Sequence, residues 1–160
     1  MQISKIFKFL AITIVGSALP LTAAAQASST FGAMHWREIG PTRAGRARAL
    51  AGVPSQPNVF YIGFDNGGVW RSTDYGSTWH PLFDHEPTGS IGAIAVAPSD
   101  PNVIYVGSGA GIIRPDLSVG DGVYKSTDAG RTWTHLDALR GTQMIAMIDV
   151  DPRDPNRFFV

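Results

Sequence analysis

The chain has 160 residues, of which 44% are hydrophobic and 16% charged, so it is long enough for one small domain and too apolar to be disordered. Its 13 basic and 13 acidic side chains balance, which leaves no basic field for a nucleic-acid backbone and predicts no nucleic-acid partner. The absence of cysteine excludes disulfide frameworks, thiolate zinc sites and cysteine nucleophiles.

The first 27 residues have the parts of a secretory signal peptide. Lys5 and Lys8 give a positive start, an apolar run follows, and Ala25 and Ala27 form a small-x-small cleavage site. The apolar run is short for a membrane span. We therefore expect cleavage after Ala27, a secreted or periplasmic protein, and no membrane association of the mature chain.

Two phrases recur along the rest of the chain. An octapeptide of the form Ser-Thr-Asp-x-Gly-x-Thr-Trp occupies residues 72–79 and 126–133. A second phrase, which contains Pro-x-x-Pro-Asn followed mostly by apolar residues, occupies residues 52–63, 97–107 and 150–160. The second unit is longer because of an insertion between Gly107 and Gly122. Unequal insertions on one side of a repeat usually build a functional face.

Each unit is predicted to contain four short strands, because the 18 glycines and 11 prolines interrupt every apolar run and no segment keeps a helical period. The predicted ranges are 47–52, 59–64, 69–72 and 78–82 in the first unit, and 91–96, 103–107, 122–126 and 132–136 in the second. Four antiparallel strands at a period near 50 residues predict an all-β chain made of β-propeller blades.

The two ends of the repeat region predict an incomplete propeller. Residues 35–39 resemble the fourth strands of the units but have no blade of their own, and residue 160 lies within the second strand of a third unit. We interpret residues 28–160 as the N-terminal part of a propeller with about two and a half blades. The expected partners of these terminal strands are C-terminal blades of the same protein.

The octapeptides have a turn chemistry of their own. The aspartate can accept hydrogen bonds from backbone N–H groups of its turn, the glycine can adopt a positive φ, and the tryptophan can bury a large ring beneath the hairpin. We expect these residues to be structural rather than catalytic: Ser72, Asp74, Gly76, Thr78, Trp79, Ser126, Asp128, Gly130, Thr132 and Trp133.

The octapeptides resemble the Asp-box, or bacterial neuraminidase repeat, of sialidases, sortilin-type receptors, photosystem-assembly propellers and xyloglucan-cleaving hydrolases. Wider phrases at residues 40–46, 67–74 and 90–102 resemble large secreted bacterial proteins described as glycosyl hydrolases with sortilin-like repeats. The resemblance covers essentially all of residues 34–160. It implies rim positions for the Asp-boxes and hydrolysis of a β-glucan or xyloglucan. The alternatives are a non-catalytic propeller that binds proteins or peptides, and a purely architectural repeat.

Asp65 is the candidate catalytic residue. It precedes Gly67 and Gly68 in a phrase similar to the Thr-Asp-x-Gly-Gly phrase of xyloglucanase-type hydrolases, with Phe64 in place of the threonine. The resemblance implies that Asp65 is one of two carboxylates roughly 6.5–9.5 Å apart in an inverting mechanism, with its partner beyond residue 160. The alternative is a tight turn, in which Asp, Asn and Gly are the expected residues.

The remaining polar clusters predict little chemistry. Arg43, Arg46 and Arg48 suggest the arginine cluster of a sialidase but lack its Phe/Tyr-Arg-Ile-Pro phrase, and the alternative is a solvated basic loop. The acidic segment 149–154 lacks the glycine and closing glutamate of an EF-hand, and the four histidines have no zinc spacing. We therefore expect no metal and no cofactor.

Overall fold

The computed structural model describes residues 45–112 and 115–160. The expected signal peptide, the strand expected at residues 35–39 and Arg43 lie outside the described residues. The described part is β-structure with one short 3₁₀ helix, η1 (Asp137–Leu139). None of its helices has the length and apolar character needed to span a membrane.

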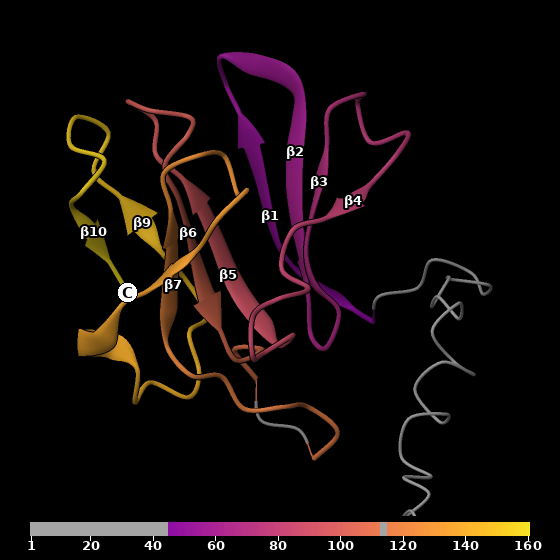
Figure 1. Ribbon diagram of the computed structural model, residues 1–160, viewed down its shortest axis with the longest axis vertical. Coiled ribbons are helices and arrows are strands. Elements are labelled where there is room, and N and C mark those ends of the chain that lie inside the picture. The colour runs from indigo at the N-terminus through magenta and orange to yellow at the C-terminus, as the bar shows by residue number, and fades with distance from the viewer. Residues whose placement is uncertain (1–44, 113–114) are drawn as a thin grey trace, which may run out of the picture. The chain divides into compact units, whose positions relative to one another are not determined.

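Two four-stranded antiparallel sheets and a strand pair follow one another along the chain (Figure 1). The first sheet has the order β1 (Ala47–Val53), β2 (Gln56–Phe64), β3 (Gly68–Ser72) and β4 (His80–Pro81). The second sheet has the order β5 (Ile91–Val96), β6 (Ile104–Ser108), β7 (Val123–Ser126) and β8 (Thr134–His135). The pair consists of β9 (Asp149–Val150) and β10 (Phe158–Phe159).

The predicted all-β architecture of four-stranded antiparallel units is confirmed. The inner three strands of each sheet agree with their predicted ranges to within three residues. The prediction of five-residue outer strands was wrong, because β4 and β8 each have two residues. The reason is local: the N–H groups of Thr78 and Thr132 donate to the turn aspartates and are not available for strand pairing.

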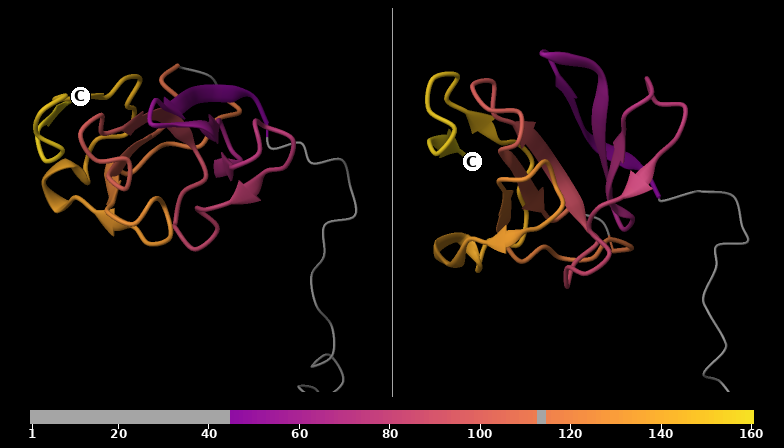
Figure 2. Two further views of the ribbon diagram at one scale, coloured as in Figure 1. Left: turned by 90° about the horizontal axis from the view of Figure 1, so that it is seen from above. Right: turned by 45° about the horizontal axis from the view of Figure 1, so that its top comes forward.

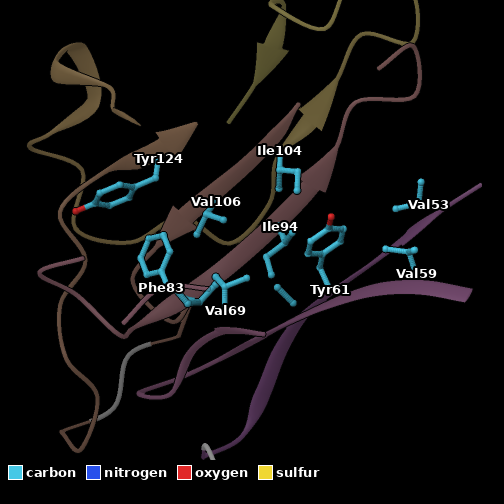
Figure 3. Close-up of a cluster of buried hydrophobic side chains, with 11 residues drawn as sticks. Val53, Val59, Tyr61, Val69, Phe83, Ile94, Ile104, Val106 and Tyr124 are labelled. Carbon is cyan, nitrogen blue, oxygen red and sulfur yellow. The ribbon is translucent and has the colours of Figure 1, made fainter. Parts of the chain in front are cut away.

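The second sheet lies between the first sheet and the β9–β10 pair, as Figures 1 and 2 show from several sides. One cluster of buried side chains joins the two large sheets; it includes Tyr61 and Val69 from the first and Ile104 and Tyr124 from the second (Figure 3). A second cluster joins the other face of the second sheet to Ile145 and neighbouring residues. Each sheet is thus stabilised mainly by burying its faces against its neighbours.

A glycine at the same place in each sheet sets the distance to the next sheet. A Cβ at Gly63 of β2 would lie 2.5 Å from Cγ2 of Ile91, and one at Gly107 of β6 would lie 2.4 Å from Cγ2 of Ile145. Both distances are far below van der Waals contact, so a side chain at either glycine would force the neighbouring strand away. The repeated glycine allows close packing of consecutive sheets.

Candidate functional site

Asp65 is the first residue of the turn that joins β2 to β3. Its backbone N–H donates to the carbonyl oxygen of Arg46, 3.0 Å away, and Gly68 completes the turn with φ +68°. The Asp65 side chain is only 3% exposed. A buried carboxylate needs charged or hydrogen-bonding partners, and the first sheet provides two arginines for this purpose.

Arg48 makes the shorter contact with Asp65. Its Nε donates to Asp65 Oδ1 over 3.1 Å. Arg48 is the extra residue of a β-bulge, since Ala47 pairs with Phe64 and Ala49 pairs with Gly63. A bulge redirects the side chain of the extra residue, and here it directs the guanidinium toward the end of the neighbouring strand. The irregular pairing of β1 therefore builds this ion pair.

Arg46 connects Asp65 to the second sheet. Its Nη1 lies 3.7 Å from Asp65 Oδ2 and 3.5 Å from Oδ2 of Asp116, which belongs to the insertion of the second unit. The Arg46 side chain is 53% exposed, whereas Asp65 Oδ2 is buried and accepts no hydrogen bond from the described residues. Arg46 is thus a loosely held cation between two carboxylates.

The insertion of the second unit reaches back over the Asp65 turn. Asn66 Nδ2 donates to the carbonyl oxygen of Asp116 over 3.1 Å, and Asn66 Oδ1 accepts from the backbone N–H of Ser118 over 3.2 Å. The turn at residues 65 and 66 therefore contacts the insertion in two ways. The Arg46 guanidinium lies between Asp65 and the insertion, and the Asn66 side-chain amide bonds to the insertion directly. The site combines residues from both sheets.

The second sheet has the same backbone arrangement without the charges. Strand pairing places Ser90, Gly92 and Gly109 where the first sheet has Arg46, Arg48 and Asp65. The backbone hydrogen bond recurs, from Gly109 N–H to the Ser90 carbonyl oxygen over 2.8 Å. A Cβ at Gly109 would meet the backbone oxygen of Gln143 at 2.1 Å, so this corner is closed by the main chain that follows. The fold can form the corner without an ion pair.

Comparisons with known proteins agree on the architecture. No family model matches the chain. A xyloglucanase from a Paenibacillus species is 28% identical over 113 residues, which cover 61% of this chain and 11% of that protein. The crystal structure of an ancestral GH74 enzyme is similar with a TM-score of 0.64 and 25% identity, over 79% of this chain and 14% of that chain. The chain has a β-propeller fold like that of these glycosyl hydrolases.

A further solved structure supports this propeller fold. The GH74 xyloglucanase from Xanthomonas campestris is similar with a TM-score of 0.53 and 22% identity, over 75% of this chain and 20% of that chain. The chain spans between 11% and 20% of the length of these three proteins. The two four-stranded sheets are therefore consecutive units of an incomplete propeller.

In both octapeptide turns, at residues 72–79 and 126–133, the aspartate is held in a cage of hydrogen bonds. Asp74 Oδ1 accepts from the N–H of Thr78 over 2.9 Å and from the Ser72 hydroxyl over 2.8 Å, and Asp74 Oδ2 accepts from the Thr78 hydroxyl over 2.6 Å. These bonds, with the Thr78 hydroxyl first, lower the pKa of Asp74 to about 2. The carboxylate has little capacity left for an external partner.

The second octapeptide turn repeats this cage with the same geometry. Asp128 Oδ1 accepts from the N–H of Thr132 over 2.9 Å, and its Oδ2 accepts from the Thr132 hydroxyl over 2.7 Å. The backbone and side-chain hydrogen bonds from Thr132 lower the pKa of Asp128 to about 2. The turn glycines Gly76 and Gly130 have φ values of +84° and +87°, the conformation that the sequence predicts for them.

The two tryptophan rings are buried only in part. Trp79 and Trp133 are both half-buried. Each indole ring lies next to the glycine of its own turn, and its Nε1 donates to a carbonyl oxygen. Only Trp133 packs against the cluster between the two sheets.

Several site residues escaped the sequence analysis. Asn66 and Asp116 were part of a turn and an insertion with no assigned role, and Ser90, whose Oγ is buried without a hydrogen-bond partner in the described part, was overlooked. The unequal length of the insertion was the one available signal. Within residues 45–112 and 115–160, no three His, Asp or Glu side chains gather to form a metal site.

Proposed function

We propose that this chain is the N-terminal part of a secreted polysaccharide hydrolase in which Asp65 is one of two catalytic carboxylates. The substrate class is a neutral β-glucan of the xyloglucan type. The likeness to a xyloglucanase and to GH74 enzyme structures supports this proposal, and so does the position of Asp65 at a strand end. Export would use residues 1–27.

The ion pair that is confined to the first sheet is the observation that supports a functional role for Asp65. Burying charges costs free energy that a well-packed apolar or glycine corner does not require. The second sheet forms the equivalent corner with Ser90, Gly92 and Gly109. Because the equivalent corner of the second sheet forms without charges, the Asp65–Arg48 pair supports a functional role for this carboxylate.

Asp65 would act as the general base of an inverting hydrolysis. It would take a proton from water as that water attacks the anomeric carbon, while an acid protonates the leaving oxygen. Arg48 fixes Oδ1, which leaves Oδ2 for the water. Arg46 covers Oδ2 at 3.7 Å with a half-exposed side chain, so a bound glycan must displace this guanidinium to reach the base.

Asp116 is a poor candidate for the second carboxylate. Arg46 Nη1 contacts both acids, so the two Oδ2 atoms are at most about 7 Å apart, and the guanidinium occupies the space that a sugar and a water would need. We expect the acid outside this chain. The two arginines and two aspartates balance, which favours a neutral glycan over the anionic substrate of a sialidase.

Replacing Asp65 by asparagine tests the proposal. In the full-length protein, Asp65→Asn should lower kcat on xyloglucan or β-glucan by about 10²–10⁴-fold, the usual contribution of a general base. Asp74→Asn and Asp128→Asn are matched controls, because their carboxylates are held by their own turns, and folded protein with either change should keep its kcat. Rates are corrected for the folded fraction by circular dichroism.

Two results would contradict the hydrolase. A wild-type protein that cleaves no glycan in a broad panel would favour the ligand-binding propeller. An Asp65→Asn protein with full activity would show that Asp65 only closes a turn.

A further inference from the structure

Asn66 makes a two-point contact that does not depend on any charge. Its amide donates to the main chain at Asp116 and accepts from the main chain at Ser118, over 3.1 and 3.2 Å. Because one planar amide satisfies a carbonyl and an N–H two residues apart, it fixes the direction of the backbone between them. Asn66 directly follows Asp65, so the contact links the candidate base to the second sheet.

The far end of the insertion is anchored independently of Asn66. The Gly120 N–H donates to the Gln143 carbonyl oxygen over 2.8 Å, and the Asp121 N–H donates to the Ser108 hydroxyl over 2.8 Å. A Cβ at Gly120 would lie 2.4 Å from the backbone of Ser108 and Gly109, so the main chains are in direct contact there. Residues 120–121 are held by the second sheet, and residues 115–119 extend from this fixed point to the first.

We propose that Asn66 is a positioning residue that clamps residues 115–119 of the second unit against the Asp65 turn, so that this segment forms a wall of the glycan site. The clamp follows from the two hydrogen bonds alone. The role as a wall of the glycan site rests on the proposed function.

The contact between Arg46 and Asp116 depends on the same placement. Asp116 receives the Asn66 amide at its backbone and the Arg46 guanidinium at its side chain, 3.5 Å away. Releasing the backbone would move the carboxylate that draws Arg46 toward the insertion. Asn66 therefore also influences how Arg46 covers Asp65, although it touches neither carboxylate with its side chain.

The test compares Asn66→Ala with Asn102→Ala in the full-length protein. The Asn102 side-chain amide also forms a hydrogen bond, to Asp100 over 3.1 Å. Asn102 precedes β6, whereas the insertion that contacts the Asp65 turn follows β6. Hydrogen–deuterium exchange of a peptide covering residues 115–121 is followed by mass spectrometry without any glycan. Asn66→Ala should accelerate exchange in this peptide by roughly tenfold, and Asn102→Ala should leave it unchanged.

A third variant separates the amide clamp from the ion pair. Asp116→Asn removes the charge but keeps the backbone carbonyl that Asn66 binds, so the peptide should stay protected. Unchanged protection in Asn66→Ala, or loss of protection in Asp116→Asn alone, would overturn the clamp.

Kinetics test the wall separately. For Asn66→Ala we expect KM on xyloglucan to rise about three- to tenfold while kcat falls less than about threefold, because a misplaced wall weakens binding more than it changes the base. An unchanged KM with a faster-exchanging peptide would overturn the wall and keep the clamp. A wild type without glycan turnover would reject the proposed function, and with it the wall, while the exchange data would still decide on the clamp.

Discussion

The two octapeptide turns differ in how their tryptophans are used, although their aspartate cages are the same. In the first turn, Trp79 Nε1 donates to the carbonyl oxygen of Gly76 in its own turn, over 3.0 Å. In the second, Trp133 Nε1 donates to the carbonyl oxygen of Leu82, which follows β4 of the first sheet, over 2.9 Å. One indole closes a local loop, and the other connects two sheets.

The two turns also differ in how their side chains pack against neighbouring sheets. The Trp133 ring contacts the ring of Phe83 edge-on at 5.2 Å, and Phe83 also contacts Tyr124 at 5.0 Å, so the second turn shares in the buried cluster between the sheets. Gly130 is buried beneath Leu82, whereas Gly76 is half-exposed. The aspartate cage is therefore the same in both turns, whereas the tryptophan contacts a neighbouring sheet only in the second turn.

Replacing the tryptophans should give the largest difference between the turns. Trp133→Ala should lower the free energy of unfolding by about 3 kcal/mol, the low end for a core aromatic because the ring is half-buried. Trp79→Ala should cost about 1 kcal/mol, since it loses one local hydrogen bond and less packing. Denaturant unfolding of both variants measures the difference. Equal losses would show that the contact with Leu82 and Phe83 adds nothing.

Replacing the turn glycines Gly76 and Gly130 should produce a smaller difference in stability between the two turns. Alanine at either position is strained by the positive φ, at a cost of roughly 1–2 kcal/mol. At Gly130 the added methyl group would also lie 2.7 Å from Leu82 Cδ1, whereas at Gly76 the nearest atom is a ring carbon of Trp79 at 3.5 Å. We expect Gly130→Ala to unfold at a lower temperature than Gly76→Ala in thermal scans. The reverse order would mean that Leu82 moves aside without cost.

The two turn aspartates, Asp74 and Asp128, should contribute equally to the pH dependence of stability. Their folded-state pKa values of about 2 lie below the ordinary value of 3.8, so each ionised carboxylate favours the folded state. This stabilisation is complete above about pH 4 and is lost as the pH falls toward 2. Because both groups are solvent-accessible, the effect should be small.

Thermal unfolding between pH 2 and 5 tests this equality. Asp74→Asn and Asp128→Asn should each flatten the acid limb of the Tm profile by the same amount. A larger change for one of them would show that its cage depends on the neighbouring sheet.

Much of the fold was predictable because its determinants are local in sequence. The inner strands are apolar runs between glycines and prolines, and the turns follow from Ser, Asp, Gly and Thr at fixed spacings. The short outer strands were not foreseen, because the competition for the N–H groups of Thr78 and Thr132 becomes visible only when the aspartate and the strand are both in place.

The candidate site was less predictable because it depends on geometry between distant residues. Asp65 was singled out from its phrase, and its catalytic role stays a prediction. Its contact with Arg48 requires a β-bulge that shifts the strand pairing by one residue. The residue pattern of β1 does not predict this bulge. The clamp by Asn66 joins positions 50 and 52 residues apart through main-chain atoms, which leave no trace in side-chain identity.

The glycines at positions 63 and 107 have a consequence for assembly. Carbon atoms pack at roughly 3.5–4.0 Å, so a methyl group that starts about 2.5 Å from an isoleucine would displace the next sheet by about 1 Å. In a closed ring of sheets, these displacements would add up from one sheet to the next, although the last sheet must still pack against the first. One hydrogen atom in place of a methyl group, at one position per repeat, therefore governs the angular tolerance with which a propeller of this kind can close.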